Sequence, residues 1–202
     1  MILERPMKIT IHPATPERWD DLAALFGPTG ACAGCWCMFF SMPRAEWRAG
    51  QGGSNRRALR RIVRDGDLPG VLAYAGDRAI GWCAIQPREA YPALIDRYPP
   101  VDDRRVWSIT CFFVDREHRG QGVMRRLLDG AVTHARRSGA RAIEAYPSDP
   151  GDRRIGSTDA YMGVRPLFEA AGFTEVGRTP RGKPIMRRAL RAGRAARRRA
   201  PE

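Results

Sequence analysis

The sequence predicts a single α/β domain built on a mixed sheet, and three features of the chain lead to that prediction. Strand-like apolar stretches alternate with amphipathic helical ones. Gly76 and Asp77 separate two strand-like stretches, the pattern of an antiparallel hairpin. A strand, a helix and a second strand follow one another over 105–147, which implies a right-handed crossover between parallel strands. We therefore expect a mostly antiparallel sheet with one parallel pair, flanked by helices.

The N-terminal segment is predicted to form a strand and then a helix. Residues 8–15 have the composition of a short strand. A helix is expected over 15–27, because Thr15 suits its N-cap and Pro16 suits its first turn. Its apolar side chains recur at helical spacing, which predicts one buried face made of Trp19, Leu22, Ala23 and Phe26.

A loop rich in glycine and cysteine follows over 27–43, and we call it the cysteine loop. Two short helices are expected after it. They span 44–50 and 54–66, and Ser54 or Asn55 is expected to cap the second one. The periodicity then changes to that of strands, and 70–87 is predicted to form the hairpin.

The stretch 105–114 is the strongest strand candidate in the chain. Its β-branched and aromatic residues, without glycine or proline, predict a central strand buried on both faces. An amphipathic helix follows a short turn and is expected to end near Gly139. The parallel partner strand is then expected over 140–147.

The C-terminal part is predicted to add a helix and a hairpin. The helix is expected over 159–173, with interruptions at Gly163 and Pro166. The hairpin would pair 173–179 with 183–190.

The composition is that of a globular protein outside the membrane. Hydrophobic residues make up 43% and charged residues 28% of the chain, and no apolar run is long enough to span a bilayer. Glu4, Arg5 and Pro6 stand where a secretory signal would be apolar, so we expect a cytoplasmic protein. The five cysteines, an odd number, indicate reduced thiols rather than a disulfide framework.

Arginine provides nearly all of the formal charge of +13, because Lys8 and Lys183 are the only lysines. Seven arginines lie between Arg187 and Arg199, so we expect a domain over 1–190 followed by a basic, mobile tail over 191–202. Nucleic-acid binding through this tail is an alternative function, although an arginine bias of the whole chain is weak evidence for such a partner.

The turn between the central strand and the amphipathic helix has an unusual composition. The first turn of a helix leaves N–H groups without partners, and a Ser, Thr, Asp or Asn side chain normally accepts from one of them. Arg119, Gly120, Gln121 and Gly122 precede this helix, and none of them is such a residue. Free N–H groups, the helix dipole, glycines and an arginine together favour an anion, and phosphate is the natural ligand.

The spacing of this turn excludes the common nucleotide-binding motifs. Arg125 stands where the third glycine of a dinucleotide fingerprint belongs, and the Lys-Ser/Thr of a P-loop is missing. The stretch HRGQGVMR instead resembles R-x-x-G-x-(G/A), the pyrophosphate-binding turn of the Gcn5-related N-acetyltransferases (GNAT). IGWCAI and LFEAAGF resemble other motifs of that superfamily, and GACAGCWCMFF resembles a bacterial subgroup with a Cys-rich N-terminal segment. Met124 departs from the pattern, because a glycine or alanine is usual at its position.

The resemblance implies a transferase that takes an acetyl group from acetyl-CoA, without a metal. It implies a cofactor-binding strand that carries a bulge and splays from its parallel neighbour. A backbone N–H near Phe112 or Phe113 is expected to polarise the thioester carbonyl, which the acceptor amine attacks directly. By position, the residues expected to bind acetyl-CoA are Cys111, Phe112, Phe113, Val114, Arg119, Gly120, Gln121, Gly122, Val123, Met124 and Phe168.

The acid and the base of the reaction stay open at this stage. Many relatives have a glutamate on the cofactor strand, but WSITCFFV has none. Either Glu144 on the next strand acts as base through water, or the acceptor is an amine of low pKa. Phe168 replaces the tyrosine that often protonates the leaving thiolate, so Tyr161, or else Tyr146, is the expected proton donor.

The acceptor is expected to be a small amine or a protein lysine. Trp36, Phe39 and Phe40 are expected to form an aromatic wall of its pocket, or else part of the core. The C-x-x-C-x-C pattern of 32–37 is compatible with a soft metal, but no fourth ligand is evident, and structural thiols are the preferred interpretation.

The predicted function is N-acetylation of a primary amine in a ternary complex, by a monomer or a homodimer. A non-catalytic acyl-CoA sensor is a further alternative, because both the strand glutamate and the helix tyrosine of the family pattern are missing.

Overall fold

The computed structural model describes residues 7–151, 156 and 160–190; the expected tail of 191–202 lies outside this range. In chain order, the strands and helices are β1 (Ile9–Pro13), α1 (Trp19–Phe26), α2 (Arg44–Ala49), α3 (Gly53–Arg64), β2 (Gly70–Ala75), β3 (Arg78–Pro87), α4 (Pro92–Arg97), β4 (Trp107–Val114), α5 (Val123–Arg137), β5 (Ala142–Ala145), α6 (Arg165–Glu169), β6 (Thr174–Arg178) and β7 (Pro184–Ala189). Short 3-10 helices accompany them: η1 (Pro16–Arg18), η2 (Arg88–Ala90) and η3 (Arg116–His118).

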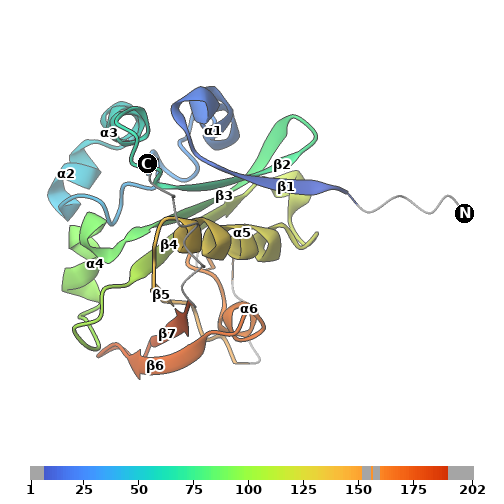
Figure 1. Ribbon diagram of the computed structural model, residues 1–202. Helices are drawn as coiled ribbons and strands as arrows, with labels where there is room; N and C mark the ends of the chain where they lie inside the picture. The colour runs from blue at the N-terminus through green and yellow to red at the C-terminus, as the bar shows by residue number, and fades with distance from the viewer. Residues whose placement is uncertain (1–6, 152–155, 157–159, 191–202) are drawn as a thin grey trace, which may run out of the picture.

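The strands form one seven-stranded sheet in the order β1-β2-β3-β4-β5-β7-β6 (Figure 1). Only β4 and β5 are parallel; every other neighbouring pair in this described sheet is antiparallel. The predicted fold, an α/β domain with a mixed, mostly antiparallel sheet and helices around it, is confirmed. The predicted central strand is β4, the middle strand of the order.

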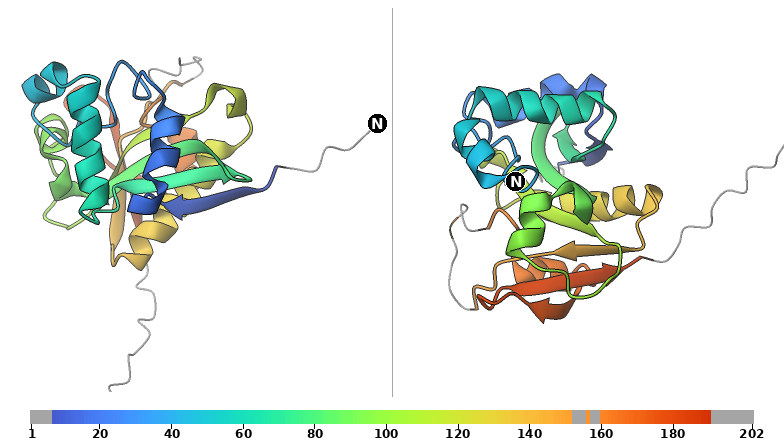
Figure 2. Two further views of the ribbon diagram at one scale, coloured as in Figure 1. Left: turned by 90° about the horizontal axis from the view of Figure 1, so that it is seen from above. Right: turned by 90° about the vertical axis from the view of Figure 1, so that its left-hand side faces the viewer.

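Helices cover both faces of the sheet (Figures 1 and 2), and a hydrophobic core lies under the helices on each face. On one face, α5 buries Leu127 and Leu128 against the strands, because its apolar residues recur on one side of the helix. On the other face, α1 and α3 cover the strands and bury Leu22, Phe26 and Leu59. None of the helices in the described residues has both the length and the apolar character needed to cross a bilayer.

The central pair of strands widens into a gap. The register passes from Ala84↔Cys111 to Ile85↔Ile109, so Thr110 is an extra residue and β4 carries a bulge there. β5 pairs with β4 only as far as Ile109, whereas β4 continues to Val114. The bulge and the early end of β5 produce the splayed parallel pair that the resemblance implied.

The helices differ from the prediction in two places. The connection between β3 and β4 contains α4, in a segment for which no helix was predicted. The helix expected over 159–173 is reduced to the five residues of α6, because Gly163 has φ 82° and Pro166 lies in the first turn.

The predicted helix caps differ in outcome. Thr15 occupies the N-cap position of η1 and Pro16 its first turn, as predicted, but the Thr15 hydroxyl accepts from Arg18 (3.1 Å) and makes no capping bond. α3 begins at Gly53, before both predicted caps. Asn55 is buried inside the helix and donates to the carbonyl oxygens of Gly34 and Trp47 (3.1 Å each), so it fastens the cysteine loop to α3.

Candidate active site

A cavity of about 620 Å³ opens between the last residues of β4 and the start of α5. All but three of the residues predicted to bind acetyl-CoA line it: Phe112, Phe113, Val114, Arg119, Gly120, Gly122, Val123 and Met124. Tyr161, the predicted proton donor, lines it as well. The structure therefore brings the predicted turn, strand and tyrosine together around one space.

The first turn of α5 forms one end of this cavity, and we call residues 119–124 the α5 turn. Gly122 is the N-cap in a left-handed conformation (φ 76°), and no side chain caps the helix. Gly120 has φ 75°, and a Cβ atom built on either glycine would meet nothing within 4 Å. The turn thus combines uncapped backbone N–H groups with open space, which fits a phosphate-bearing ligand.

Two arginines add positive charge at this end. Arg119 donates from Nε to the carbonyl oxygen of Val114 (3.1 Å), which holds its guanidinium beside the end of β4. Arg125 also lines the cavity, and it pairs with Asp129 (3.2 Å) and donates to the carbonyl oxygen of Ala170 (3.1 Å). Both guanidiniums are held in place by the protein before any ligand arrives.

Three residues predicted to bind the cofactor do not line the cavity. The Cys111 side chain packs in the core under α1 and α3, where its Sγ is 3.4 Å from Sγ of Cys37. Gln121 donates to the carbonyl oxygen of Glu117 (2.8 Å). Phe168 is fully buried against Phe112, with ring centroids 6.2 Å apart, so it packs behind a residue of the cavity wall.

The backbone of β4 faces the gap at alternate residues. The N–H of Phe112 donates across the gap to the carbonyl oxygen of Tyr161 (2.6 Å). Because successive backbone groups of a strand point to opposite edges, Phe113 turns its N–H to β3, where it is opposite Trp82. Val114, like Phe112, faces the gap. The carbonyl-polarising role predicted near Phe112 or Phe113 therefore fits Phe112 and Val114 rather than Phe113.

Tyr161 lies in the turn before α6 rather than on a helix, as was expected. It is half-buried, and burial is the main reason that its pKa rises to about 12. The hydroxyl therefore stays protonated at neutral pH and can donate a proton.

Sequence reasoning missed six residues of the cavity wall: Ala31, Cys32, His118, Arg125, Ala160 and Leu167. Ala31 and Cys32 belong to the cysteine loop, where four non-glycine residues have positive φ. The glycines of that loop were the available signal, but they do not indicate the direction in which the loop folds.

Glu144 lies in a buried ion network instead of the cavity wall, and is 1% exposed. Its Oε2 accepts from Arg88 Nη1 (2.6 Å) and from the Tyr146 hydroxyl (3.0 Å). Its Oε1 accepts from Arg187 Nη2 (2.6 Å) and Nε (3.0 Å), and Arg187 also pairs with Asp102 (2.6 Å). Because buried donors engage both carboxylate oxygens, the predicted role of Glu144 as base is not supported by its surroundings.

Tyr146, the other predicted hydroxyl, belongs to the same network. It is fully buried, and its oxygen lies 3.0 Å from Ser108 Oγ. Burial raises the pKa of Tyr146 above its usual value. The Tyr146 hydroxyl is hydrogen-bonded to Glu144 and Arg88 and does not line the cavity, whereas Tyr161 does.

The three predicted acceptor-wall residues divide between two places. Phe40 is buried and Phe39 half-buried in a cluster that also contains Tyr161; we call it the aromatic cluster, and its other members are Tyr91, Leu94, Tyr98, Tyr146, Met162, Val176, and Ile185. Trp36 is 3% exposed in the core under α1 and α3, between Trp19 and Phe26. Phe39 and Phe40 thus adjoin Tyr161, whereas Trp36 belongs to the core, the other role considered for it.

The cysteine loop contains free thiols in different environments. Cys32 is exposed, and Cys35 and Cys37 are half-buried. The contact with Cys111, together with burial, raises the pKa of Cys37, and burial raises the pKa of Cys35. These raised pKa values favour neutral thiols, as the structural interpretation expects. Among the described residues, the group close enough to share a cation is Asp115, Glu117 and His118, and Arg78 already pairs with both carboxylates.

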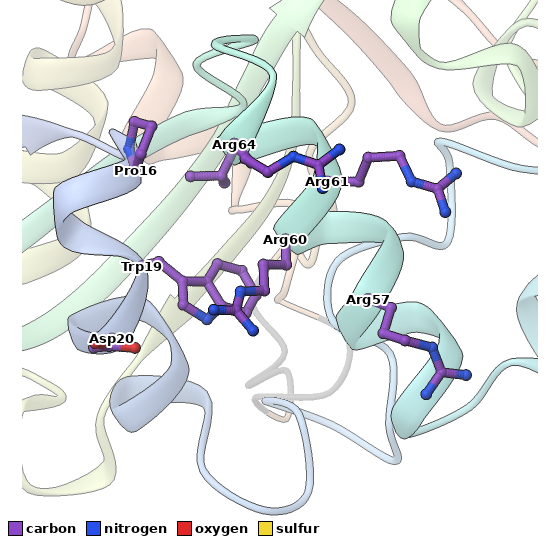
Figure 3. A pocket seen from close by; sticks show the side chains of 8 residues that line it. Pro16, Trp19, Asp20, Arg57, Arg60, Arg61 and Arg64 are labelled. Carbon is purple, nitrogen blue, oxygen red and sulfur yellow. The ribbon is translucent and has the colours of Figure 1, made fainter.

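A second basic cavity, of about 570 Å³, lies between α1 and α3, and we call it the arginine groove (Figure 3). Arg57, Arg60, Arg61 and Arg64 of α3 line it, and Arg60 lies over the ring of Trp19, 5.8 Å from the centroid. No Asp or Glu occurs in α3. The groove shares no lining residue with the cavity at β4.

The sequence profile of the acetyltransferase (GNAT) family matches residues 36–157, more than half of the chain. The chain belongs to the GNAT family of acetyltransferases. The match includes the bulged strand and the α5 turn, whereas Tyr161 lies outside it. The Cys-rich bacterial subgroup stays a prediction.

Solved structures of acetyltransferases share the fold at low identity. An N-acetyltransferase from Staphylococcus aureus Mu50 has a TM-score of 0.55 and 16% identity, covering 91% of this chain and 99% of its own. The PaiA N-acetyltransferase of Thermoplasma acidophilum, in complex with coenzyme A, has a TM-score of 0.52 and 16% identity, covering 91% and 100%. YncA of Salmonella typhimurium, with its cofactor acetyl-CoA, has a TM-score of 0.54 and 16% identity, covering 93% and 96%. Among curated proteins, none matches the chain.

Proposed function

We propose that the protein is an N-acetyltransferase that moves the acetyl group of acetyl-CoA to a primary amine by direct attack in a ternary complex. The observation that carries this proposal is the cavity in which the splayed β4, the uncapped α5 turn and Tyr161 meet. Membership of the GNAT family supports it, as do the neighbours solved with coenzyme A or acetyl-CoA. A cytoplasmic location and a monomeric or homodimeric state remain predictions.

Different residues of the cavity would bind different parts of acetyl-CoA. The N–H groups of the α5 turn would bind the diphosphate, with Arg119 and Arg125 as counter-charges. The backbone groups of Phe112 and Val114 would pair with the amide-bearing arm as a neighbouring strand would. Phe112 would then exchange its bond to Tyr161 for one to the ligand.

Tyr161 is assigned the role of proton donor. In the transfer, the amine nitrogen forms a bond to the acyl carbon and the carbon–sulfur bond breaks. The leaving thiolate takes the hydroxyl proton of Tyr161, and the proton lost by the amine passes to water and restores the hydroxyl. Among the described residues that line the cavity, none is a carboxylate, so we expect the acceptor to react as the free amine.

The first experiment measures acetyl-CoA binding by calorimetry and the release of coenzyme A thiol with small amines and lysine peptides in parallel. Binding with amine-dependent thiol release supports the proposal. Binding without release for any amine would favour the acyl-CoA sensor, and absence of binding would contradict both. Binding of nucleic acid that disappears on deleting 191–202, without turnover, would favour the alternative function of the tail.

A second experiment replaces the proposed donor. Tyr161→Phe should lower kcat by about 100-fold with little change in KM for acetyl-CoA, because removal of a general acid slows the chemical step. Tyr146→Phe is the matched control: it removes hydrogen bonds of the buried network, so it should lower thermal stability and leave kcat nearly unchanged. The reverse pattern would assign the proton to Tyr146.

A pH profile tests the absence of a protein base. Because the pKa of Tyr161 is raised to about 12, its hydroxyl stays protonated across the assay range. The rate should therefore follow only the free-amine fraction and rise with pH until the pKa of the acceptor is reached. A descending limb between about pH 7 and 10 would contradict this assignment.

A further inference from the structure

The aromatic cluster reaches the surface beside the cofactor cavity, and the protein's own cations cover its rings there. The Cζ atoms of Arg44 and Arg97 lie 5.9 Å and 6.0 Å from the ring centroid of Phe39. The Nζ atom of Lys183 lies 5.9 Å from the ring centroid of Tyr98. These distances are those of cation–π contacts.

Cations from two distant segments meet at this surface. Arg97 is the last residue of α4, whereas Lys183 belongs to the turn between β6 and β7. Lys183 donates to Sδ of Met162, a neighbour in sequence of Tyr161 (3.5 Å). Arg181 lies two residues before Lys183 in the same turn, and its charge, like that of Arg97, opposes the increase in the pKa of Tyr98 that burial causes.

We call Arg44, Arg97, Arg181 and Lys183 the basic rim. Arg97 and Arg181 are both exposed, and neither forms an ion pair with any carboxylate of the described residues. Their charge is therefore available to a ligand.

The basic rim is linked to the cofactor cavity through Tyr161, on which the charge of Arg97 acts. The aromatic cluster contains Tyr161, which lines the cofactor cavity, together with Phe39 and Phe40, the two predicted acceptor-wall residues that adjoin it. A substrate that reaches Tyr161 across this cluster passes the rim. Uncovered aromatic faces would attract an ammonium group, but here resident guanidinium and ammonium groups occupy them. The cavity beside Phe39 is lined by Arg44 and Arg97 and by one carboxylate, Asp96, so its net charge is positive and disfavours a second cationic group on the acceptor.

We propose that the acceptor carries an oxyanion, a carboxylate or a phosphate, besides its amine, and that Arg97 and Arg181 of the basic rim bind this group. The inference rests on the proposed acetyltransferase function. The planar guanidinium suits a carboxylate or phosphate because it donates two parallel hydrogen bonds. The same charge disfavours lysine side chains in basic peptide segments, so the inference selects small anionic amines from the two acceptor classes that the sequence left open.

The experiment compares acceptors that differ only in the distal group. 4-Aminobutyrate is paired with 4-aminobutanamide, and 3-aminopropylphosphonate identifies whether the oxyanion is preferred as carboxylate or as phosphonate. With the wild-type protein, kcat/KM should be about 10-fold higher for the anionic member of the pair than for the amide, mainly through KM. The same pairs are titrated by calorimetry into the complex with coenzyme A, so that binding is measured even where turnover is slow.

Variants locate the effect. Arg97→Gln should raise KM for 4-aminobutyrate about 10-fold and leave kcat and the kinetics of the amide nearly unchanged. Arg97→Lys should restore part of the difference. Arg57→Gln, which removes the same charge from the arginine groove, is the matched control and should change neither acceptor. Arg181→Gln should act in the same direction as Arg97→Gln.

The outcomes separate this inference from the proposed function. Equal or better use of the amide by the wild type, or an equal effect of Arg97→Gln on both members of the pair, overturns the inference and leaves the acetyltransferase function intact. Acetyl-CoA binding without any preference between the pair, in turnover or in calorimetry, overturns it as well. Failure to bind acetyl-CoA would instead remove the proposed function.

Discussion

The cavity at the α5 turn and the arginine groove are both basic and are similar in size, yet they offer an anion different groups. The cavity at the α5 turn measures about 620 Å³ and the groove about 570 Å³. The groove has the greater number of arginines, four from one helix. α3 and α5 both begin at a glycine N-cap without a side-chain cap, Gly52 and Gly122. The N-cap and first turn of α5 line its cavity, whereas the residues of α3 that line the groove begin at Arg57, beyond its first turn.

The difference shows that the number of positive charges does not by itself define an anion site. The guanidiniums of the groove are on long side chains, and binding an anion there would require them to lose rotational freedom. In the α5 turn the donors belong to the backbone and are fixed by the helix. Arg119 is fixed as well, through its bond to the Val114 carbonyl oxygen. We therefore assign the acetyl-CoA diphosphate to the α5 turn and regard the groove as a solvated helix face.

The largest effect expected from this comparison comes from reversing one charge in each region. Arg119→Glu should weaken acetyl-CoA binding by about 100-fold, because a charge-assisted donor becomes a repelling carboxylate. Arg61→Glu in the groove should leave the affinity unchanged. Calorimetry with both variants is the measurement, and equal losses would show that general electrostatic attraction, not the turn, controls binding.

A smaller effect should follow from changing the backbone of the turn without changing its charge. Gly122→Val places a β-branched residue at φ 76°, which should reduce stability by about 1–2 kcal/mol and acetyl-CoA affinity by about 10-fold. Gly122→Asn is the matched control, because asparagine adopts this conformation more readily. Denaturant titration and calorimetry give the two quantities. Equal behaviour of both variants would mean that the left-handed N-cap is not required.

The smallest expected effect is a gain of stability in the groove. Arg57 and Arg61 are four residues apart on α3, as are Arg60 and Arg64, so like charges face each other along the helix. Arg57→Glu would replace one repulsion by an attraction and should raise the free energy of unfolding by about 0.5 kcal/mol at low salt. High salt should remove the gain. A loss of acetyl-CoA affinity in this variant would contradict the separation of the two regions.

The sequence predicted those parts of the site that depend on neighbouring residues. The missing cap at Gly122 and the apolar spacing of α5 can be read within a few residues, and both were confirmed. The surroundings of Glu144 could not be read in this way, because its partners Arg88 and Arg187 lie 56 and 43 residues away. The same is true of Trp36, whose place in the core depends on the packing of α1.

The helix expected over 159–173 was wrong in its first half, because the backbone conformation there does not follow the spacing of the apolar side chains. The apolar residues after 159 are spaced as in a helix, but Gly163 takes a left-handed conformation and the chain turns there. The turn gives Tyr161 its position: its carbonyl oxygen faces β4, and the residue lines the cavity. An uninterrupted helix would have placed this tyrosine differently.

The bonds across the gap between β4 and β5 also bear on solubility. A sheet that separates in its middle exposes a strand edge, and bare edges promote pairing with other chains. Here the Tyr161 carbonyl oxygen accepts from the Phe112 N–H, and Arg119 donates to the Val114 carbonyl oxygen. These two bonds occupy backbone groups of β4 that would otherwise be free to pair with a strand of another chain. We expect the cofactor arm to replace them when it binds.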